Sequence, residues 1–255
     1  MTSLRFFPLA GLLVATPAAA LPDDPLQSPM WEFVGSQILG ADASVRFDPR
    51  VRVVMPQIAE NQRVFPVTVD ARGIAGVRRI VVMIDLNPIQ KAVDYQLREA
   101  EPYLSVRVKL DQRTPVRGLV QLADGSWLAG GSWIDAAGGG CSAPPVSRVK
   151  GDWAQHLGEV RGEQWTGGSG GTLRLAFRHP MDTGLVDNIP AYHLEEVTVA
   201  TAGGKRVGTL QIQAATAEDP VFTLRPRTAG EELRITGRDT NGVGYAALIP
   251  AVRAR

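Results

Sequence analysis

The chain has 255 residues, of which 44% are hydrophobic and 21% charged, and its formal net charge is +1. This is the composition of an ordinary globular protein, and the length suggests two domains. A net charge near zero, with no block of Lys or Arg, argues against nucleic acid or an anionic membrane as the main partner. The single cysteine, Cys141, excludes an internal disulfide, a Cys-x-x-Cys redox motif and a Cys-x-x-Cys-His haem site.

Residues 1–20 have the pattern of a secretory signal peptide. Arg5 precedes the apolar run FFPLAGLLVA, and small residues end the segment at Ala20. The run is too short to span a bilayer, and no later stretch reaches the roughly 20 apolar residues that a membrane helix needs. We therefore expect an exported protein without a membrane span, cleaved near Ala20.

A short amphipathic helix is predicted after the cleavage site. Ser28 is a candidate N-cap, Pro29 would occupy the first helical position, and Gly40 follows the last turn. Four apolar residues recur at helical spacing: Met30, Phe33, Val34 and Ile38. Because the stripe is short and has no basic face, we expect it to pack on a sheet rather than on a membrane.

From Val51 onward the hydrophobic period changes to two, and turn formers such as Asp124-Gly125 separate the runs. The predicted strands of this half are 51–55, 64–70, 78–85, 104–110, 116–124 and 126–135. Several short strands without a long helix between them favour an antiparallel β-sandwich over residues 21–135.

Residues 136–171 look irregular and contain two glycine clusters, AAGGGCSAPP and TGGSGG. Structureless segments of this length inside a compact protein are usually functional or are linkers. We predict a flexible Gly- and Pro-rich arm that carries Cys141.

The period of two resumes in the second half, residues 172–255, which we expect to form a smaller β-sandwich. Gly203-Gly204 and Asn241-Gly242 are strong hairpin signals because both supply positive φ angles. The predicted strands are 172–178, 194–201, 205–213, 221–226, 232–240 and 243–249. The fold class is therefore all-β, with two sandwich domains, a short N-terminal helix and a Cys-bearing linker.

The surroundings of Cys141 favour carrying a group over catalysing a reaction. The predicted arm consists of the residues that flank the thiol: Gly138, Gly139, Gly140, Ser142, Ala143 and Pro144. Six residues from the preceding strand give the sulfur a reach of roughly 20 Å. No neighbouring Lys, Arg or His lowers its pKa, and a flexible arm holds no catalytic base in place. Burial of the thiol is not expected in such a segment.

The two halves of the sequence resemble the two subunits of a bacterial sulfur-oxidising carrier. A strand followed by GGGCSAP resembles SoxY, and RHPMDTG, IPAYHLEEVTV and the late DTNG hairpin resemble SoxZ. The chain thus resembles fused SoxYZ-like carrier proteins of the type associated with quinoprotein dehydrogenases. The resemblance implies two immunoglobulin-like domains that pack on each other, a periplasmic location, a sulfur intermediate held covalently on Cys141, and periplasmic oxidoreductases as partners.

Two features depart from the sulfur-oxidising SoxY. Its arm reads Gly-Gly-Cys-Gly-Gly and ends the chain, whereas here Ser142 and Ala143 follow the cysteine and a second domain continues. These differences are compatible with a carrier role, but they weaken the expectation that thiosulfate is the substrate. The alternatives are an adaptor that docks a quinoprotein dehydrogenase with an incidental thiol, an intermolecular disulfide, and a thiol enzyme that uses His156 or His193 as its base.

No cofactor and no metal site are predicted. Nothing with blue-copper spacing follows Cys141. His179 and Met181 could form a copper pair, but Pro180 and Gly184 favour a turn between two strands.

The four tryptophans near the arm are assigned to packing. Trp127 and Trp133 share one face of a strand and are expected to fill a core. Trp153 and Trp165 are expected to hold the linker against a sandwich surface, or alternatively to shelter the modified cysteine.

Overall fold

The computed structural model describes residues 21–40, 42–167, 170–228 and 230–251. The predicted signal peptide, residues 1–20, lies outside the described residues. Within the described part, no helix is long and apolar enough to cross a membrane.

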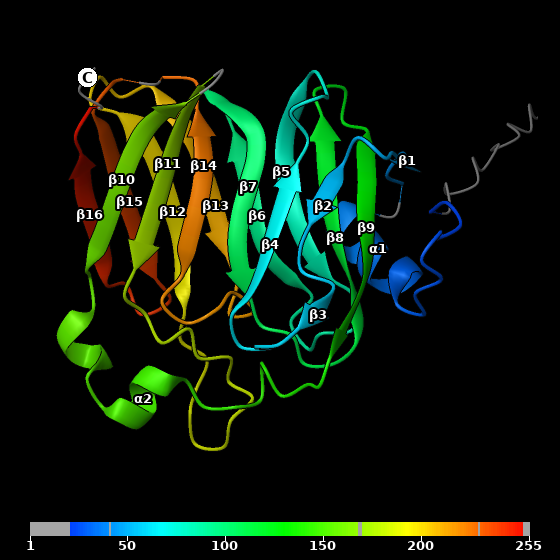
Figure 1. Ribbon diagram of the computed structural model, residues 1–255, viewed down its shortest axis with the longest axis horizontal. Helices are drawn as coiled ribbons and strands as arrows, with labels where there is room; N and C mark the ends of the chain where they lie inside the picture. Colours follow the sequence, from blue (N-terminus) through cyan, green and yellow to red (C-terminus); the bar gives the residue numbers. More distant parts are fainter. Residues whose placement is uncertain (1–20, 41, 168–169, 229, 252–255) are drawn as a thin grey trace, which may run out of the picture.

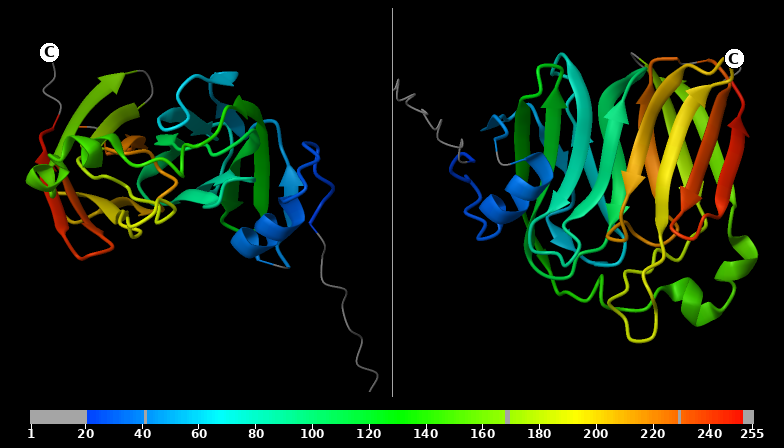
Figure 2. Two further views of the ribbon diagram at one scale, coloured as in Figure 1. Left: turned by 90° about the horizontal axis from the view of Figure 1, so that it is seen from below. Right: turned by 180° about the vertical axis from the view of Figure 1, so that it is seen from behind.

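Helix α1 (Trp31–Leu39) lies against the first half of the molecule (Figure 2) and begins later than the sequence predicts. Met30, not Ser28, is its N-cap residue, and no side chain caps the helix. Trp31 is buried, whereas Phe33, expected on the buried stripe, is 57% exposed. The helix packs on the sheet as expected, but with a narrower apolar face.

The rest of the described chain is mostly β-strand, and each half supplies its own set. The first half contributes β1 (Val45–Phe47), β2 (Arg52–Val54), β3 (Ile58–Ala59), β4 (Phe65–Asp70), β5 (Val77–Ile84), β6 (Lys91–Leu97), β7 (Ala100–Val108), β8 (Thr114–Leu122) and β9 (Trp127–Ala136). The second half contributes β10 (Val160–Gly167), β11 (Gly170–Phe177), β12 (Leu194–Thr201), β13 (Arg206–Ile212), β14 (Val221–Pro226), β15 (Leu233–Asp239) and β16 (Gly244–Ile249).

These strands form two sheets that pack face to face (Figure 1). One sheet has the order β1-β9-β8-β5-β6-β13-β12-β15-β16, with β3 paired to β9, and the other has the order β10-β11-β14-β7-β4-β2. β1 and β3 pair with β9 in parallel, whereas the neighbouring strands of the main ladders pair antiparallel. The Gly204 and Gly242 hairpin turns have positive φ angles, as predicted.

Both sheets run without interruption from the first half into the second. In the larger sheet β6 pairs with β13, and in the smaller sheet β7 pairs with β14. Each half is thus a two-layer sandwich, and the two sandwiches join edge to edge (Figures 1 and 2). The predicted fold class, all-β with two immunoglobulin-like sandwiches that pack on each other, is confirmed.

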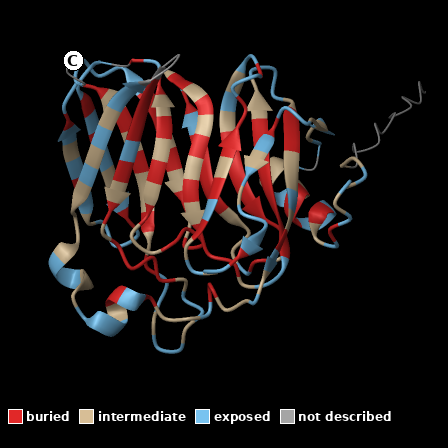
Figure 3. Cartoon of the chain, viewed as in Figure 1, coloured by how far each residue is buried: buried red, intermediate tan, exposed pale blue. Residues whose placement is uncertain are grey.

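One hydrophobic core spans the junction between the halves. Leu104 and Val106 of β7 lie opposite Leu224 and Phe222 of β14, and all four side chains are buried. They belong to a single cluster with residues from both sandwiches, and buried positions continue across the strands of both halves (Figure 3). Burial of apolar surface therefore holds the two sandwiches together.

The segment after β9 is more regular than the sequence predicts. It contains helix α2 (Val146–Lys150), a 3₁₀ helix (Trp153–His156) and the strand β10, which pairs with β11 along its whole length. The expectation of an irregular segment up to residue 171 is therefore wrong, and Trp165 lies on β10, not in a linker. The domain limits at residues 135 and 171 stay predictions.

Candidate functional site around Cys141

Cys141 lies in a segment that crosses from one sandwich to the other at one end of both sheets. This segment, residues 138–151, is called the strap below. It leaves β9, runs along the lower end of the molecule and leads through α2 toward β10 (Figures 1 and 2). Its position brings the cysteine to the junction between the two halves.

The glycines before Cys141 are required by a fixed conformation. Gly138 and Gly139 have φ angles of +101° and +79°, which side-chain-bearing residues rarely adopt. A Cβ on Gly140 would lie 2.3 Å from the Gln62 carbonyl oxygen and 2.4 Å from that of Leu110. The triplet that suggested flexibility is thus also the sequence that lets the strap dock.

Cys141 is fully buried, with 0% exposure, so the expectation of an exposed thiol is wrong for this conformation. Its backbone N–H donates to Asp111 Oδ1 at 3.1 Å, and its carbonyl accepts a 2.7 Å hydrogen bond from Thr183 Oγ1. The Asn87 amide nitrogen lies 3.7 Å from the sulfur. Asn87 and Asp111 belong to the first half and Thr183 to the second, so both sandwiches hold the cysteine.

Burial keeps the docked thiol protonated. Desolvation raises the pKa of Cys141 to about 12, although the positive charge of Lys109 acts in the opposite direction. Burial also lowers the pKa of Lys109, to about 8. At neutral pH the docked sulfur is therefore a neutral thiol, which is a poor nucleophile.

The flanking arm residues anchor the strap in different ways. The Ser142 hydroxyl donates to Asp111 Oδ1, and the Pro144 carbonyl accepts from the Arg63 guanidinium. Ala143 is half-buried and makes no side-chain hydrogen bond. The arm residues on both sides of the cysteine thus lie against the first sandwich.

After the prolines, the strap is attached to the second sandwich. The Glu218 carboxylate accepts hydrogen bonds from the N–H groups of Val146 and Ser147, the first residues of α2. Arg148 forms a two-pronged ion pair with the fully buried carboxylate of Asp182. The hydrogen bonds to Glu218 replace the side-chain N-cap that α2 lacks, and the ion pair adds a second attachment.

Trp153 holds the end of the strap, as predicted. The Arg148 guanidinium carbon lies 4.2 Å from the centre of its ring, and Trp153 packs edge-on against Tyr192. Trp127 is buried, as expected of a core residue, whereas Trp133 is half-buried and donates from its indole N–H to the Leu26 carbonyl.

The segment around His179 and Met181 is a turn, as favoured from the sequence. His179 is buried, and its Nδ1 accepts the N–H of Met181 at 2.9 Å, so the imidazole proton resides on Nε2. The sulfur of Met181 accepts the N–H of Leu194. Across the described residues, no group of three or more His, Cys, Asp or Glu could hold a metal.

None of the histidines hydrogen-bonds the thiol in the described part of the chain. His156 Nδ1 contacts Glu159, and His193 Nδ1 contacts the carbonyl of Leu194. Neither residue serves the thiol as a base in this conformation.

Sequence reasoning missed the polar residues that surround Cys141. They are Asn87, Lys109, Asp111 and Thr183. Of these four residues, only Thr183 lies within a motif used in the sequence analysis, RHPMDTG. Lys109 follows β7 at a position that strand alternation assigns to the exposed face, because Val108 before it is buried.

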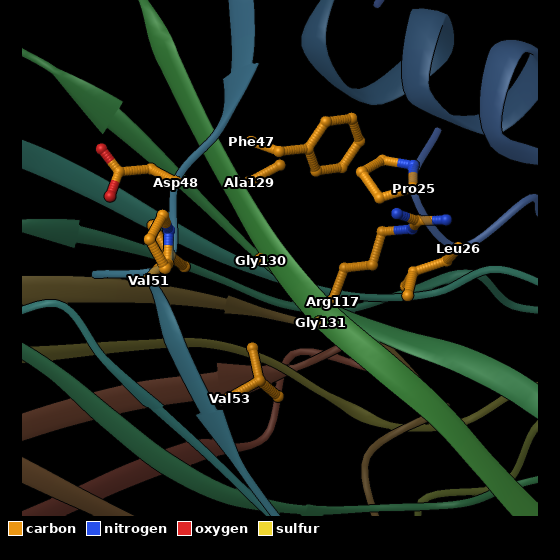
Figure 4. Close-up of a pocket in the computed structure, with 11 residues that line it drawn as sticks. Pro25, Leu26, Phe47, Asp48, Val51, Val53, Arg117, Ala129, Gly130 and Gly131 are labelled. Atoms are coloured by element: carbon orange, nitrogen blue, oxygen red, sulfur yellow. The ribbon is translucent and has the colours of Figure 1, made fainter. Parts of the chain in front are cut away.

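A separate pocket of about 340 Å³ opens on the first sandwich (Figure 4). Its lining includes Pro25, Phe47 and Arg117, and it contains none of the residues that hydrogen-bond Cys141. The Arg117 guanidinium is fully buried and pairs with the carboxylates of Asp24 and Asp85. In this pocket Arg117 therefore fastens the N-terminal segment to the sandwich.

Comparison with known proteins gives two family matches in tandem. Residues 36–141 match the model of the sulfur oxidation protein SoxY, and residues 162–247 match that of the sulphur oxidation protein SoxZ. The SoxY match thus ends at Cys141. No curated protein matches the chain at the required significance.

Two solved structures show more distant similarity. The sulfur carrier protein SoxY from Chlorobium limicola f thiosulfatophilum is 20% identical, with a TM-score of 0.37, and covers 42% of this chain and 94% of its own. The BSP domain of a biofilm associated protein is 12% identical, with a TM-score of 0.27, and covers 89% of this chain and 33% of its own. The tandem family matches, on a pair of joined sandwiches, show that the chain belongs to the SoxY and SoxZ families as a SoxY–SoxZ fusion.

Proposed function

We propose that this protein is a non-enzymatic carrier that holds a sulfur-containing group covalently on Cys141 and presents it to partner enzymes in the periplasm. The observation that carries the proposal is the position of the only cysteine, at the end of the SoxY match and on a strap that joins the two sandwiches. A carrier needs a single accessible attachment point, and its partners supply the catalytic groups.

A carrier cycle requires the strap to leave its docked position. The docked sulfur has no exposure, so a partner enzyme cannot reach it. Gly139 and Gly151 have positive φ angles and free space around them, which suits them as hinges at the two ends. Once released, the thiol returns toward its ordinary pKa of about 8.5, and a thiolate becomes available.

Loading on the released strap requires no oxidant. The Cys141 thiolate attacks the outer sulfur of a sulfane donor such as thiosulfate. A bond forms between the two sulfurs, the S–S bond of the donor breaks, and sulfite leaves with the bonding electron pair. The product is a persulfide anion on Cys141, so atoms and charge balance.

The test is loading of the purified, reduced protein with thiosulfate or polysulfide, followed by intact mass measurement. We expect a mass increase of one or more sulfur atoms that a phosphine reductant removes. Cys141→Ser should fold normally and gain no mass. Absence of any increase in the wild-type chain would contradict the proposal.

The second candidate is an adaptor that docks a periplasmic quinoprotein dehydrogenase. Exposed apolar residues near the strap favour a partner surface: Val146, Val149 and Leu185 are 44%, 75% and 45% exposed. Cys141→Ser separates the two functions. A carrier loses pathway activity in the host with this variant, whereas an adaptor with an incidental thiol keeps it.

A further inference from the structure

Lys109 is a buried cation that has no carboxylate partner among the residues that the structure describes. It is only 5% exposed, and its ammonium group donates to the carbonyl oxygens of Met181 and, at 2.9 Å, of Ala214. The lysine ion pairs found in the described residues are those of Lys91 and Lys205. Burying a charge without a counter-ion is costly, so its retention at this position calls for an explanation.

The cysteine is the acidic group most strongly coupled to this cation. A negative charge on Cys141 raises the Lys109 pKa more than the charges of Asp182 and Glu218 do, against the lowering effect of burial. Asp182 is already paired with Arg148, and Glu218 is engaged by backbone N–H groups of α2. Among these three groups, only the Cys141 sulfur has neither an ion pair nor a backbone N–H donor in the described part of the chain.

Shared anchors keep Lys109 and Cys141 together. The Asn87 amide donates to the Lys109 carbonyl at 2.7 Å and lies 3.7 Å from the Cys141 sulfur. The loop at 181–183 accepts from the Lys109 ammonium through Met181 and donates to the Cys141 carbonyl through Thr183. Both residues are therefore held by the same two elements.

An ammonium group has three N–H donors, and the two carbonyl acceptors use two of them. The third has no acceptor among the hydrogen bonds of the described residues. The neutral thiol of Cys141 offers this third N–H group no negative charge. A persulfide anion or a sulfonate on Cys141 would add one, together with acceptor atoms.

We propose that Lys109 recognises the negative charge of the group carried on Cys141, so that the strap docks more firmly with an anionic sulfur adduct than with a neutral one. This inference rests on the proposed carrier function and assigns the charge class of its cargo. The competing explanation is that Lys109 only ties the first sandwich to two loops of the second. In that case the variant Lys109→Met destabilises every form of the protein equally.

The test compares two small adducts on the unique cysteine. Methyl methanethiosulfonate converts the thiol to a neutral methyl disulfide and releases methanesulfinic acid. Sulfite then attacks this disulfide, forms the anionic S-sulfonate and releases methanethiolate. Each adduct is installed through transient opening of the strap and verified by intact mass, so the comparison does not depend on whether cells load Cys141.

The measurements are the melting temperature and the hydrogen exchange of residues 138–151. We expect the S-sulfonate of the wild-type chain to melt about 2–4 °C above the methyl disulfide, with slower exchange of the strap. The difference should vanish in Lys109→Met and persist in Lys150→Met, which removes an exposed lysine of the same strap.

Equal melting temperatures of the two wild-type adducts, or a difference that persists in Lys109→Met, would overturn the proposal. If Lys109→Met does not fold, a comparison within the wild-type chain replaces it. Ethyl disulfides that end in a sulfonate or in a trimethylammonium group reverse the charge at similar size. Higher strap protection with the sulfonate supports the proposal, and equal or lower protection refutes it.

Discussion

At the scale of single residues, the sequence around Cys141 is compatible with two interpretations, a mobile segment and a segment docked against the sandwiches. Three glycines beside a lone cysteine indicate mobility because glycine restricts the backbone least. The same glycines fit a docked conformation in which Gly140 lies against two carbonyl oxygens. Composition alone does not distinguish these readings, since the contacts of Gly140 come from residues distant in sequence.

Gly140→Ala should release the strap. The added methyl group would overlap the carbonyl oxygens of Gln62 and Leu110, an overpacking that costs about 1–3 kcal/mol. Because about 1.4 kcal/mol corresponds to a factor of ten, the alkylation rate of Cys141 should rise roughly tenfold or more. The matched control is Gly73→Ala, where the added methyl meets nothing within 4 Å. An unchanged rate in Gly140→Ala would show that the thiol is not sheltered by docking.

His179 should make stability depend on pH in a defined window. Burial lowers its pKa to about 4, from 6.5. Between these values the unfolded chain binds a proton that the folded chain does not, so the free energy of unfolding falls as the pH is lowered from 6.5 to 4. Urea unfolding at several pH values should show that the free energy of unfolding depends less steeply on pH in His179→Gln than in the wild-type chain. Equal slopes in the wild-type chain and in His179→Gln would contradict the assignment.

At the scale of elements, the structure shows why the sequence analysis missed two of the strands, β6 and β10. β6 carries Asp94, whose carboxylate is buried in an ion pair with Arg79, and this charged residue interrupts the apolar pattern. β10 alternates polar residues with Gly162, whose missing side chain makes room for Ile249. A search for alternating apolar residues detects neither strand. In β6 an ion pair compensates the charged residue, and in β10 a side chain from another strand fills the space beside the glycine.

Helix α2 should depend on Arg148. Arg148→Met leaves the fully buried carboxylate of Asp182 without its cation, which costs about 1–3 kcal/mol. We expect the melting temperature to fall by roughly 3–10 °C and hydrogen exchange of the strap to increase. Arg161→Met is the control, since Arg161 is 85% exposed and its ion pair contributes little. Similar losses in the two variants would argue against an anchoring role for Arg148.

At the scale of the whole molecule, the all-β class and the presence of two sandwiches follow from strand periodicity and hairpin signals, whereas the packing of the two sandwiches on each other is implied only by the resemblance to SoxY and SoxZ. The continuity of the sheets follows from neither, because it depends on which edges meet. β6 and β7 face β13 and β14 across the junction, and Gly208 allows close packing there, since a Cβ on it would lie 2.5 Å from the Tyr95 ring. The fit between these sheet edges depends on the shape of the folded surfaces, which the pattern of a single strand does not contain.

The halves should therefore stay together when the chain between them is cut. A protease site inserted at the exposed Gly151 would allow cleavage between the sandwiches. The two fragments should elute together in size-exclusion chromatography without denaturant, because the common core and both sheets remain. Separation of the fragments would mean that the covalent strap, not the shared sheets, holds the halves in place.

The most direct test of the carrier account is the intact mass of the protein purified from the periplasm of its native cells, before and after treatment with a phosphine. The account predicts an added mass on the peptide that contains Cys141 and its loss on reduction, and the added mass identifies the carried group. A bare thiol that also fails to gain mass from sulfur donors would contradict the account. A doubled mass that collapses on reduction would instead make Cys141 the link of a dimer.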